Sequence, residues 1–349
     1  MTTSSLNDQL DRLARLEPCR PFLTLYLNTD VDGTGKHVHD VFVRKALADV
    51  LKQHPERSVE RDHLVQTRDR IETYLANDLK PSTRGLALFA CHAMDLFIPC
   101  ELRVPFERNE VAVSDRPHVY QLARVCDQYP RCAAVVIDTH TARIFVFSAG
   151  ETEAYFELQN PKSKHFKAGG TSQARFQRHA ENAHLLHVKE VIDRLGTMLQ
   201  SGVDHLVVVG DEVVVPLFKE QLPEKMAERL VDVIRLDIRA SEADIFDATM
   251  QAMRRRDEEG DRTLVEQLVG DSRAGGRAVL GLQNTRRALR DGQVETLVIA
   301  AMPEHVPGNQ TADELVAAAR QTSASVHFVE DPMLMQPVGG VAARLRFIA

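Results

Sequence analysis

A polar segment from Gln159 to Arg178 contains the residues of this 349-residue chain that are best suited to contact a phosphate-rich partner. It carries no acidic side chain and five cations, which are Lys162, Lys164, Lys167, Arg175 and Arg178. Near its centre, Gly169 and Gly170 permit backbone conformations and close approaches that larger residues prevent. Gln173 places an amide beside this flexible point. Cations around a bare glycine pair predict a loop that follows phosphate groups. We call residues 159–178 the basic segment.

A second polar stretch, NTDVDGTGKH from Asn28 to His37, is similar to two ligand-binding loops but completes neither. As a calcium loop it offers oxygen ligands at suitable spacings, but its twelfth position is His39 instead of the required bidentate glutamate. As a phosphate-binding loop it has Gly35-Lys36, but it lacks the first glycine and the Ser or Thr after the lysine. We therefore predict a turn between a strand and a helix.

The pattern HAENAHLLH, from His179 to His187, is a second candidate for metal binding. His184 and His187 are about one helical turn apart and could share a metal ion, but no third ligand is evident. A half-exposed helix face is the interpretation we favour. Ser172 does not suggest a serine hydrolase, because no nucleophile elbow surrounds it. A soluble metal- or nucleotide-dependent enzyme that uses Asp30 and Asp32, or the two histidines, remains an alternative.

The composition indicates a soluble globular protein of two or three domains, with 44% hydrophobic and 27% charged residues. No apolar run approaches the roughly 20 residues of a membrane helix, and the polar N-terminus lacks a signal-peptide core, so we expect a cytoplasmic protein. The five cysteines form no C-x-x-C pair, and we expect reduced, mainly structural thiols. The net charge is −7, and subtracting the +5 of the basic segment leaves −12 for the rest. Such a distribution is typical of a protein that meets RNA at one end only.

Hydrophobic periodicity predicts an α/β fold in three consecutive domains with mixed or parallel sheets and helices on both faces. The first domain, 1–127, has predicted strands at 21–29, 84–90 and 95–104, helices at 39–53 and 57–78, and a polar closing run that ends at Pro117. The second, 128–258, has a three-strand meander, the basic segment, a long helix at 173–200, strands at 204–211 and 230–236, and a helix from Ser241 to about Glu258. The third, 259–349, has a helix at 263–269 followed by alternating strands and helices.

Three separated segments, read together, resemble the eukaryotic and archaeal class-1 peptide release factors and Pelota. KHFKAGGTSQARF (164–176) resembles the Gly-Gly-Gln loop of that family, with Lys164-His165 before the glycines and Arg175-Phe176 after them. VLGLQNTRRALRDGQVETLVI (279–299) resembles a strand–helix–strand segment of the family's third domain. GGVAARLRF (339–347) resembles the final strand shared by release factors and Pelota. The chain is therefore identified as a member of the bacterial branch of the archaeo-eukaryotic release factor family. A peptidyl-tRNA-cleaving type of factor and the hibernation factor Balon look related to it in the same way.

The resemblance implies a release-factor- or Pelota-like arrangement of domains and a protein that occupies the ribosomal A site, next to rRNA and peptidyl-tRNA. It implies a catalytic tip at Gly169, Gly170 and Gln173, since Thr171 stands at the family's glutamine position and the next glutamine is Gln173. The implied RNA-binding residues are Lys162, Lys164, His165, Lys167, Arg175 and Arg178. We expect no metal or other cofactor and no membrane, and a translational GTPase as a further partner.

Two activities fit this resemblance. The motifs with which the eukaryotic factors decode stop codons are missing from residues 1–127, so ribosome rescue by peptidyl-tRNA hydrolysis is favoured over codon-specific termination. The alternative is ribosome hibernation, in which the protein shields the A site and the peptidyl transferase centre without catalysis.

Overall fold

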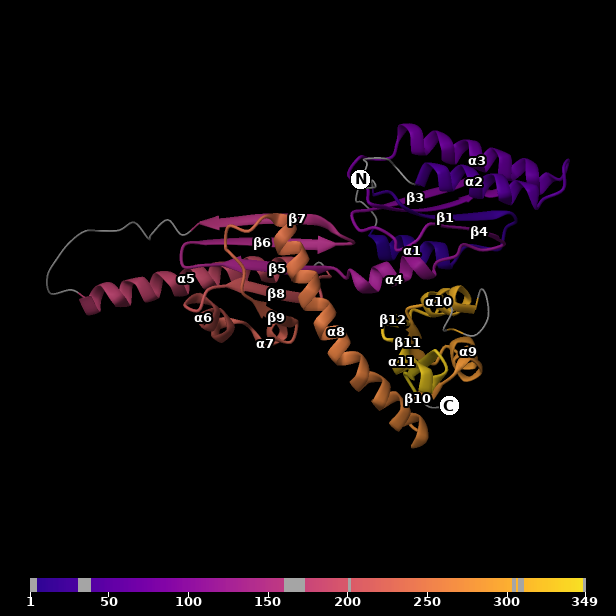
Figure 1. The fold of residues 1–349 in the computed structure, drawn as a ribbon. Helices are drawn as coiled ribbons and strands as arrows, with labels where there is room; N and C mark the ends of the chain where they lie inside the picture. The colour runs from indigo at the N-terminus through magenta and orange to yellow at the C-terminus, as the bar shows by residue number, and fades with distance from the viewer. Residues whose placement is uncertain are drawn as a thin grey trace. The chain divides into compact units, whose positions relative to one another are not determined.

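The computed structural model of the protein describes residues 5–30, 39–159, 173–199, 202–302, 306 and 311–347, and the side chains of helix α5 from residue 181 onward. These residues form three β-sheets with helices packed on them (Figure 1). The chain divides into two compact units, Met1–Gln128 with Gly260–Ala349, and Tyr129–Glu259. Each unit is described by itself. The predicted α/β fold with three sheets is confirmed.

The first sheet, in the N-terminal part of the larger unit, is antiparallel throughout and has the strand order β3-β2-β1-β4. Its strands are β1 (Phe22–Asn28), β2 (Gly85–Cys91), β3 (Leu96–Leu102) and β4 (Glu110–Ser114). One face packs against α2 (His39–Lys52) and α3 (Val59–Asn77) through buried residues such as Leu25, Leu88, Leu47 and Ile71. The short 3-10 helix η1 (His92–Met94) connects β2 with β3.

The sheet in the C-terminal part of this unit is mixed and has the strand order β10-β13-β11-β12. Its strands are β10 (Ala278–Leu280), β11 (Val294–Ala300), β12 (Ser325–Val329) and β13 (Val341–Leu345). Strand β13 lies between β10 and β11 and is antiparallel to both, whereas β11 and β12 are parallel. The associated helices are α9 (Leu282–Arg290), α10 (Thr311–Gln321), α11 (Pro332–Met335) and the 3-10 helix η3 (Gln336–Val338).

Two helices join the N-terminal and C-terminal parts of this unit. Helix α1 (Leu6–Ala14) packs against α10 and α4, and α4 (Tyr120–Gln128) packs against β12 and α10. Arg320 of α10 donates hydrogen bonds to Asp11 at 2.6 Å and to Asn7 at 3.2 Å, so α1 is held to the C-terminal part by charge as well as by packing.

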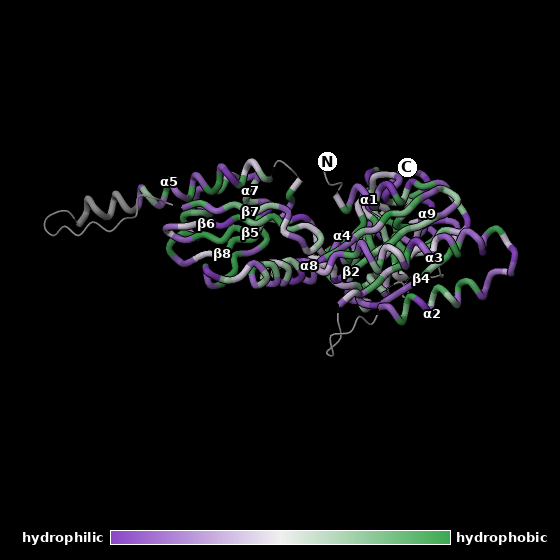
Figure 2. The backbone as a smooth tube through the Cα atoms, turned by 90° about the horizontal axis from the view of Figure 1, so that it is seen from above, coloured by the Kyte–Doolittle hydropathy of each residue, from purple (hydrophilic) through white to green (hydrophobic). Residues whose placement is uncertain are grey.

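The second unit contains a mixed five-stranded sheet of order β7-β6-β5-β8-β9. Its strands are β5 (Cys132–Ile137), β6 (Thr141–Ser148), β7 (Glu151–Gln159), β8 (His205–Gly210) and β9 (Leu230–Ile234). One face packs against α5 (Gln173–Leu199), α6 (Val214–Gln221) and α7 (Glu224–Ala227), and the other against α8 (Glu242–Arg273). The inner strands β5 and β8 are predominantly hydrophobic (Figure 2), as burial on both faces requires.

Several predictions of single elements were wrong. Helices α1 and α4 were not predicted, and neither was β4, which lies within the polar run that was expected to close the first domain. The first sheet is antiparallel and not mixed. The predicted helices at 241–258 and 263–269 are one continuous helix of 32 residues, α8. The proposed division into domains 1–127, 128–258 and 259–349 remains a prediction.

Candidate nucleic-acid interface

The basic segment connects β7 with α5 at one end of the five-stranded sheet. Gln159, the last residue of β7, pairs with Thr141 at the start of β6, while Ile137 at the end of β5 pairs with Gly210 at the end of β8. The segment therefore leaves the sheet where the parallel strands β5 and β8 have their carboxyl ends.

The predicted site residues fall into two groups. Lys162, Lys164, His165, Lys167, Gly169 and Gly170 lie outside the described residues. Gln173, Arg175 and Arg178 lie at the start of α5, where a helix was predicted, but their side chains are outside the described part of the chain. Their assignment to catalysis and RNA binding therefore remains a prediction.

Among the described side chains of helix α5, those from His187 onward fix the helix to the sheet. Among its described side chains, those of residues 181–186 are exposed or half-buried, and His187 is the first that is buried. Val188, Val191 and Leu195 are then fully buried against the sheet. Each such side chain contributes roughly 1.5–3 kcal/mol to the free energy of folding. Residues 181–186, which make up about one and a half helical turns, therefore lie between the core and the end of α5 that carries the basic segment.

A cation–π contact joins the two elements on either side of the basic segment. The guanidinium of Arg194, on α5, lies 4.0 Å from the ring centroid of Phe156, on β7. Sequence reasoning missed this pair, since its two members are separated by the whole basic segment. Such contacts contribute roughly 0.5–1 kcal/mol when exposed, and this one holds the start of the segment beside the helix that follows it.

Two aspartates at this end of the sheet, Asp138 and Asp211, accept hydrogen bonds within their own turns. Asp138 accepts hydrogen bonds from the backbone N–H of His140 at 2.6 Å and from the Thr141 hydroxyl at 3.2 Å. Asp211 accepts from the N–H groups of Val213 at 3.0 Å and Val214 at 2.8 Å, and thereby starts α6. These aspartates are therefore engaged by their own loops, and neither lies in an arrangement suited to general acid–base catalysis.

Of the residues considered for the alternative metal or nucleotide site, Asp30 is held in an ion pair. Asp30 accepts two hydrogen bonds from Arg84, each 2.8 Å long, and these bonds hold the pKa of the Asp30 carboxyl below its usual value. Asp32 lies outside the described residues. His187 is buried, although a half-exposed face had been expected, and neither of its ring nitrogens has a hydrogen-bond partner within the described structure. Across the residues that the structure describes, no three His, Cys, Asp or Glu side chains are grouped to hold a metal ion.

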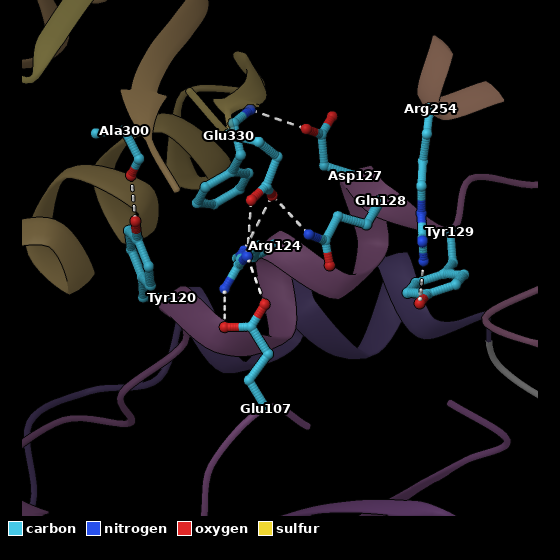
Figure 3. A network of polar contacts seen from close by, with 10 residues as sticks. Glu107, Tyr120, Arg124, Asp127, Gln128, Tyr129, Arg254, Ala300 and Glu330 are labelled. Carbon is cyan, nitrogen blue, oxygen red and sulfur yellow. Dashed lines mark hydrogen bonds and ion pairs between the residues drawn. The ribbon is translucent and has the colours of Figure 1, made fainter. Parts of the chain in front are cut away.

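A polar network around α4, in the larger unit, was also missed by sequence reasoning (Figure 3). The buried Arg124 donates to Glu107 at 2.9 and 3.0 Å and to Glu330 at 2.8 and 3.1 Å. Beside it, His327 of β12 pairs with Asp127 of α4 at 3.5 Å and with Asp261 of α8 at 2.6 Å. The two carboxylates therefore join α4 and α8 to one strand of the C-terminal sheet.

The part of the chain that contains the basic segment is similar to a known protein family. Residues 117–254 match the model of bacterial archaeo-eukaryotic release factor family 10. This central segment belongs to the bacterial archaeo-eukaryotic release factors. The release-factor segment includes α4, the five-stranded sheet and the whole of residues 159–178.

Relatives over the full length are remote. The uncharacterized protein Rv2629 of Mycobacterium tuberculosis is 25% identical in an alignment 362 residues long, which covers 94% of this chain and 94% of Rv2629. Ribosome-bound archaeal Pelota is similar over 100% of this chain and 96% of its own, with 14% identity and a TM-score of 0.44. Pelota of Archaeoglobus fulgidus is similar over 99% of this chain and 94% of its own, with 14% identity and a TM-score of 0.37. Among the described residues of this chain, no helix is both long and apolar enough to cross a membrane.

Proposed function

We propose that the protein binds the ribosomal A site and rescues stalled ribosomes by promoting hydrolysis of peptidyl-tRNA. The observation that carries this proposal is that the basic segment, with its glycine pair, lies inside the part of the chain that belongs to the bacterial release factors. The attachment of this segment to a helix whose described side chains are exposed or half-buried from residue 181 to residue 186 supports a role away from the core of the unit.

The proposed mechanism depends on positioning. Water attacks the ester that links the peptide to the tRNA, and the factor has to place that water and exclude bulk solvent. Gly169 and Gly170 let the backbone enter a crowded RNA site because they carry no side chain. A backbone N–H or the Gln173 amide orients the water or stabilises the leaving 3′ hydroxyl. Lys162, Lys164, His165, Lys167, Arg175 and Arg178 contact rRNA phosphates and fix the position of the loop.

The proposal is tested by measuring peptide release from purified stalled ribosomes. Replacing Gly170 by Ala adds a methyl group and restricts the backbone, and we expect it to abolish release. Gly270→Ala is the matched control, because a Cβ atom at this exposed position of α8 meets nothing within 4 Å. Full release by the Gly169→Ala/Gly170→Ala double variant, with the control also active, would show that the glycine pair has no part in the reaction.

Thr171 favours a second function, ribosome hibernation. It stands where the resembled release factors have the glutamine of their Gly-Gly-Gln loop, so this position of the tip lacks the side-chain amide that those factors carry there. In this function the protein occupies vacant A sites and shields the peptidyl transferase centre. Parallel assays on vacant and stalled ribosomes separate the two functions, because a hibernation factor binds vacant ribosomes tightly and releases no peptide.

Three further features belong to this proposal. The N-terminal region 1–127 would face the decoding side, 128–258 would carry the loop, and 259–349 would be the release-factor-type C-terminal domain. A translational GTPase would deliver the protein to the ribosome. The site of action would be the cytoplasm, where these partners are found.

A further inference from the structure

Two of the five cysteines face each other in the N-terminal part of the larger unit. Cys91, the last residue of β2, donates a hydrogen bond from its thiol to Cys19, and the two Sγ atoms lie 3.0 Å apart. This separation is about 1 Å longer than a disulfide bond. The pair spans 72 positions of sequence and joins two different segments, so only the fold brings it together.

The other three cysteines have different surroundings. Cys100 of β3 contacts the Gln9 side-chain oxygen at 2.8 Å, Cys126 lies on α4, and Cys132 is buried in β5 of the other unit. Cys19 is half-buried and Cys91 is fully buried. The pair therefore combines a thiol that reagents can reach with a protected thiol next to it.

We propose that Cys19 and Cys91 form a reversible disulfide by exchange with a low-molecular-weight disulfide such as glutathione disulfide. This inference concerns a modification site and does not depend on the proposed ribosomal function. It departs from the sequence-based expectation of reduced, mainly structural thiols.

The exchange takes place in two balanced steps. The Cys19 thiolate attacks one sulfur of glutathione disulfide, forms a mixed disulfide and expels one glutathione thiolate. The Cys91 thiolate then attacks Cys19 Sγ and expels the second glutathione. The two cysteines lose two protons and two electrons, and one glutathione disulfide becomes two glutathione molecules. Burial raises the pKa of the Cys91 thiol, so the less buried Cys19 is the thiol that reacts first.

The position of Cys19 gives the crosslink a structural consequence. Cys19 lies between α1 and β1, and its backbone N–H donates to the Asp115 carbonyl at 2.7 Å. Helix α1 in turn packs on α10 and pairs with Arg320. A disulfide between Cys19 and Cys91 would therefore link the segment that follows α1 covalently to β2 of the first sheet. It would stabilise the N-terminal part of the unit against unfolding.

The test uses the full-length protein in glutathione buffers of increasing oxidation. After oxidation, thiol counting in denaturant should find three reactive thiols instead of five, and peptide mapping without reductant should find Cys19 linked to Cys91. The melting temperature should rise by roughly 5 °C or more and return after dithiothreitol treatment. Cys100→Ser, which alters another buried cysteine of the same sheet, should retain this shift, whereas Cys19→Ser and Cys91→Ser should lose it.

Peptide mapping of the wild type keeps the test decisive even when a serine variant fails to fold. All five thiols remaining reactive under oxidising conditions, or a disulfide that joins any other pair, would overturn the proposal.

Discussion

At the residue scale, the best-defined electrostatic feature is His327, which lies between Asp127 and Asp261. Burial disfavours the charged imidazole, but hydrogen bonds and attraction from the two aspartates outweigh it and raise the pKa of His327 to about 10. The ring is therefore positively charged near neutral pH. Loss of the histidine charge would leave the buried Asp261 and the half-buried Asp127 without this counter-ion. Asp127 also accepts a hydrogen bond from the Phe328 N–H at 2.8 Å.

We predict that His327→Gln lowers the free energy of unfolding at pH 7 by about 2–4 kcal/mol. The folded-state pKa of about 10 lies above the usual value of 6.5. The ion pair therefore contributes its full stability below about pH 6.5, and this contribution is lost as the pH rises through 10. Urea unfolding from pH 6 to pH 10 should show the gap between wild type and variant closing as the pH rises.

The control for this experiment is His140→Gln, which changes an exposed turn of the other unit. It should leave the free energy of unfolding almost unchanged at each pH. A gap between wild type and His327→Gln that stays constant from pH 6 to pH 10 would mean that the charge of His327 does not stabilise the fold.

The sequence predicts in which element a residue lies better than it predicts which distant residues it contacts. The start of α5 at Gln173 was predicted from the sequence, as the end of a polar, glycine-containing loop. The pairing of His327 with Asp127 and Asp261 does not, because the partners belong to three different elements. His187 shows the same limit, since helical spacing places it one turn from His184 but the packing of α5 on the sheet decides that it is buried.

At the scale of elements, periodicity predicted the strands of the core and the longer helices. The missed elements carry weaker signals. Helix α1 is short and polar, and it begins with a capping box between Ser5 and Asp8. Strand β4 follows Pro105 within a charged stretch and is stabilised by pairing with β1, which a local pattern does not reveal. Helix α4 buries the charged Arg124, whose two glutamate partners come from distant segments.

Helix α8 shows why the prediction of two helices was wrong. The stretch DEEGDR (257–262) is charged and contains Gly260, and such a sequence is typical of a break. The helix continues because both of its halves have buried residues, among them Ile245 and Met253 before this stretch and Leu268 after it. The boundary between the two compact units falls between Glu259 and Gly260, within this helix.

We predict that Gly260→Ala and Gly270→Ala each stabilise α8 by about 0.5–1 kcal/mol. Both glycines are exposed, and a Cβ atom at either position meets nothing within 4 Å. Amide hydrogen exchange should become slower in each case around the substituted residue. Only Gly260→Ala, at the boundary between the units in the chain, should also reduce ribosome-dependent peptide release, because it stiffens the helix at that boundary.

The outcome separates two roles of the glycine. If the two variants change peptide release equally, or not at all, Gly260 is an ordinary helix position and bending of α8 at the unit boundary has no part in the function.

At the scale of the whole molecule, the distribution of charge and the family assignment point in the same direction. The five cations of residues 159–178 stand against −12 on the remaining chain, and they fall inside the segment that belongs to the bacterial release factors. Many exposed cations of the described body are paired, for example Arg235 with Glu212 at 2.7 Å and Arg70 with Asp95 at 3.0 Å. Binding to an RNA surface should therefore depend on the basic segment far more than on the body.

The central claim is tested most directly by co-sedimentation with 70S ribosomes over a series of salt concentrations. Replacing Lys162, Lys164 and Lys167 by Ala should weaken binding and lower the slope of log affinity against log salt by roughly 2–3. The matched control replaces three exposed lysines of the same unit, Lys189, Lys219 and Lys225, and should bind like the wild type. Equal affinities and equal slopes for wild type, loop variant and control would contradict the account.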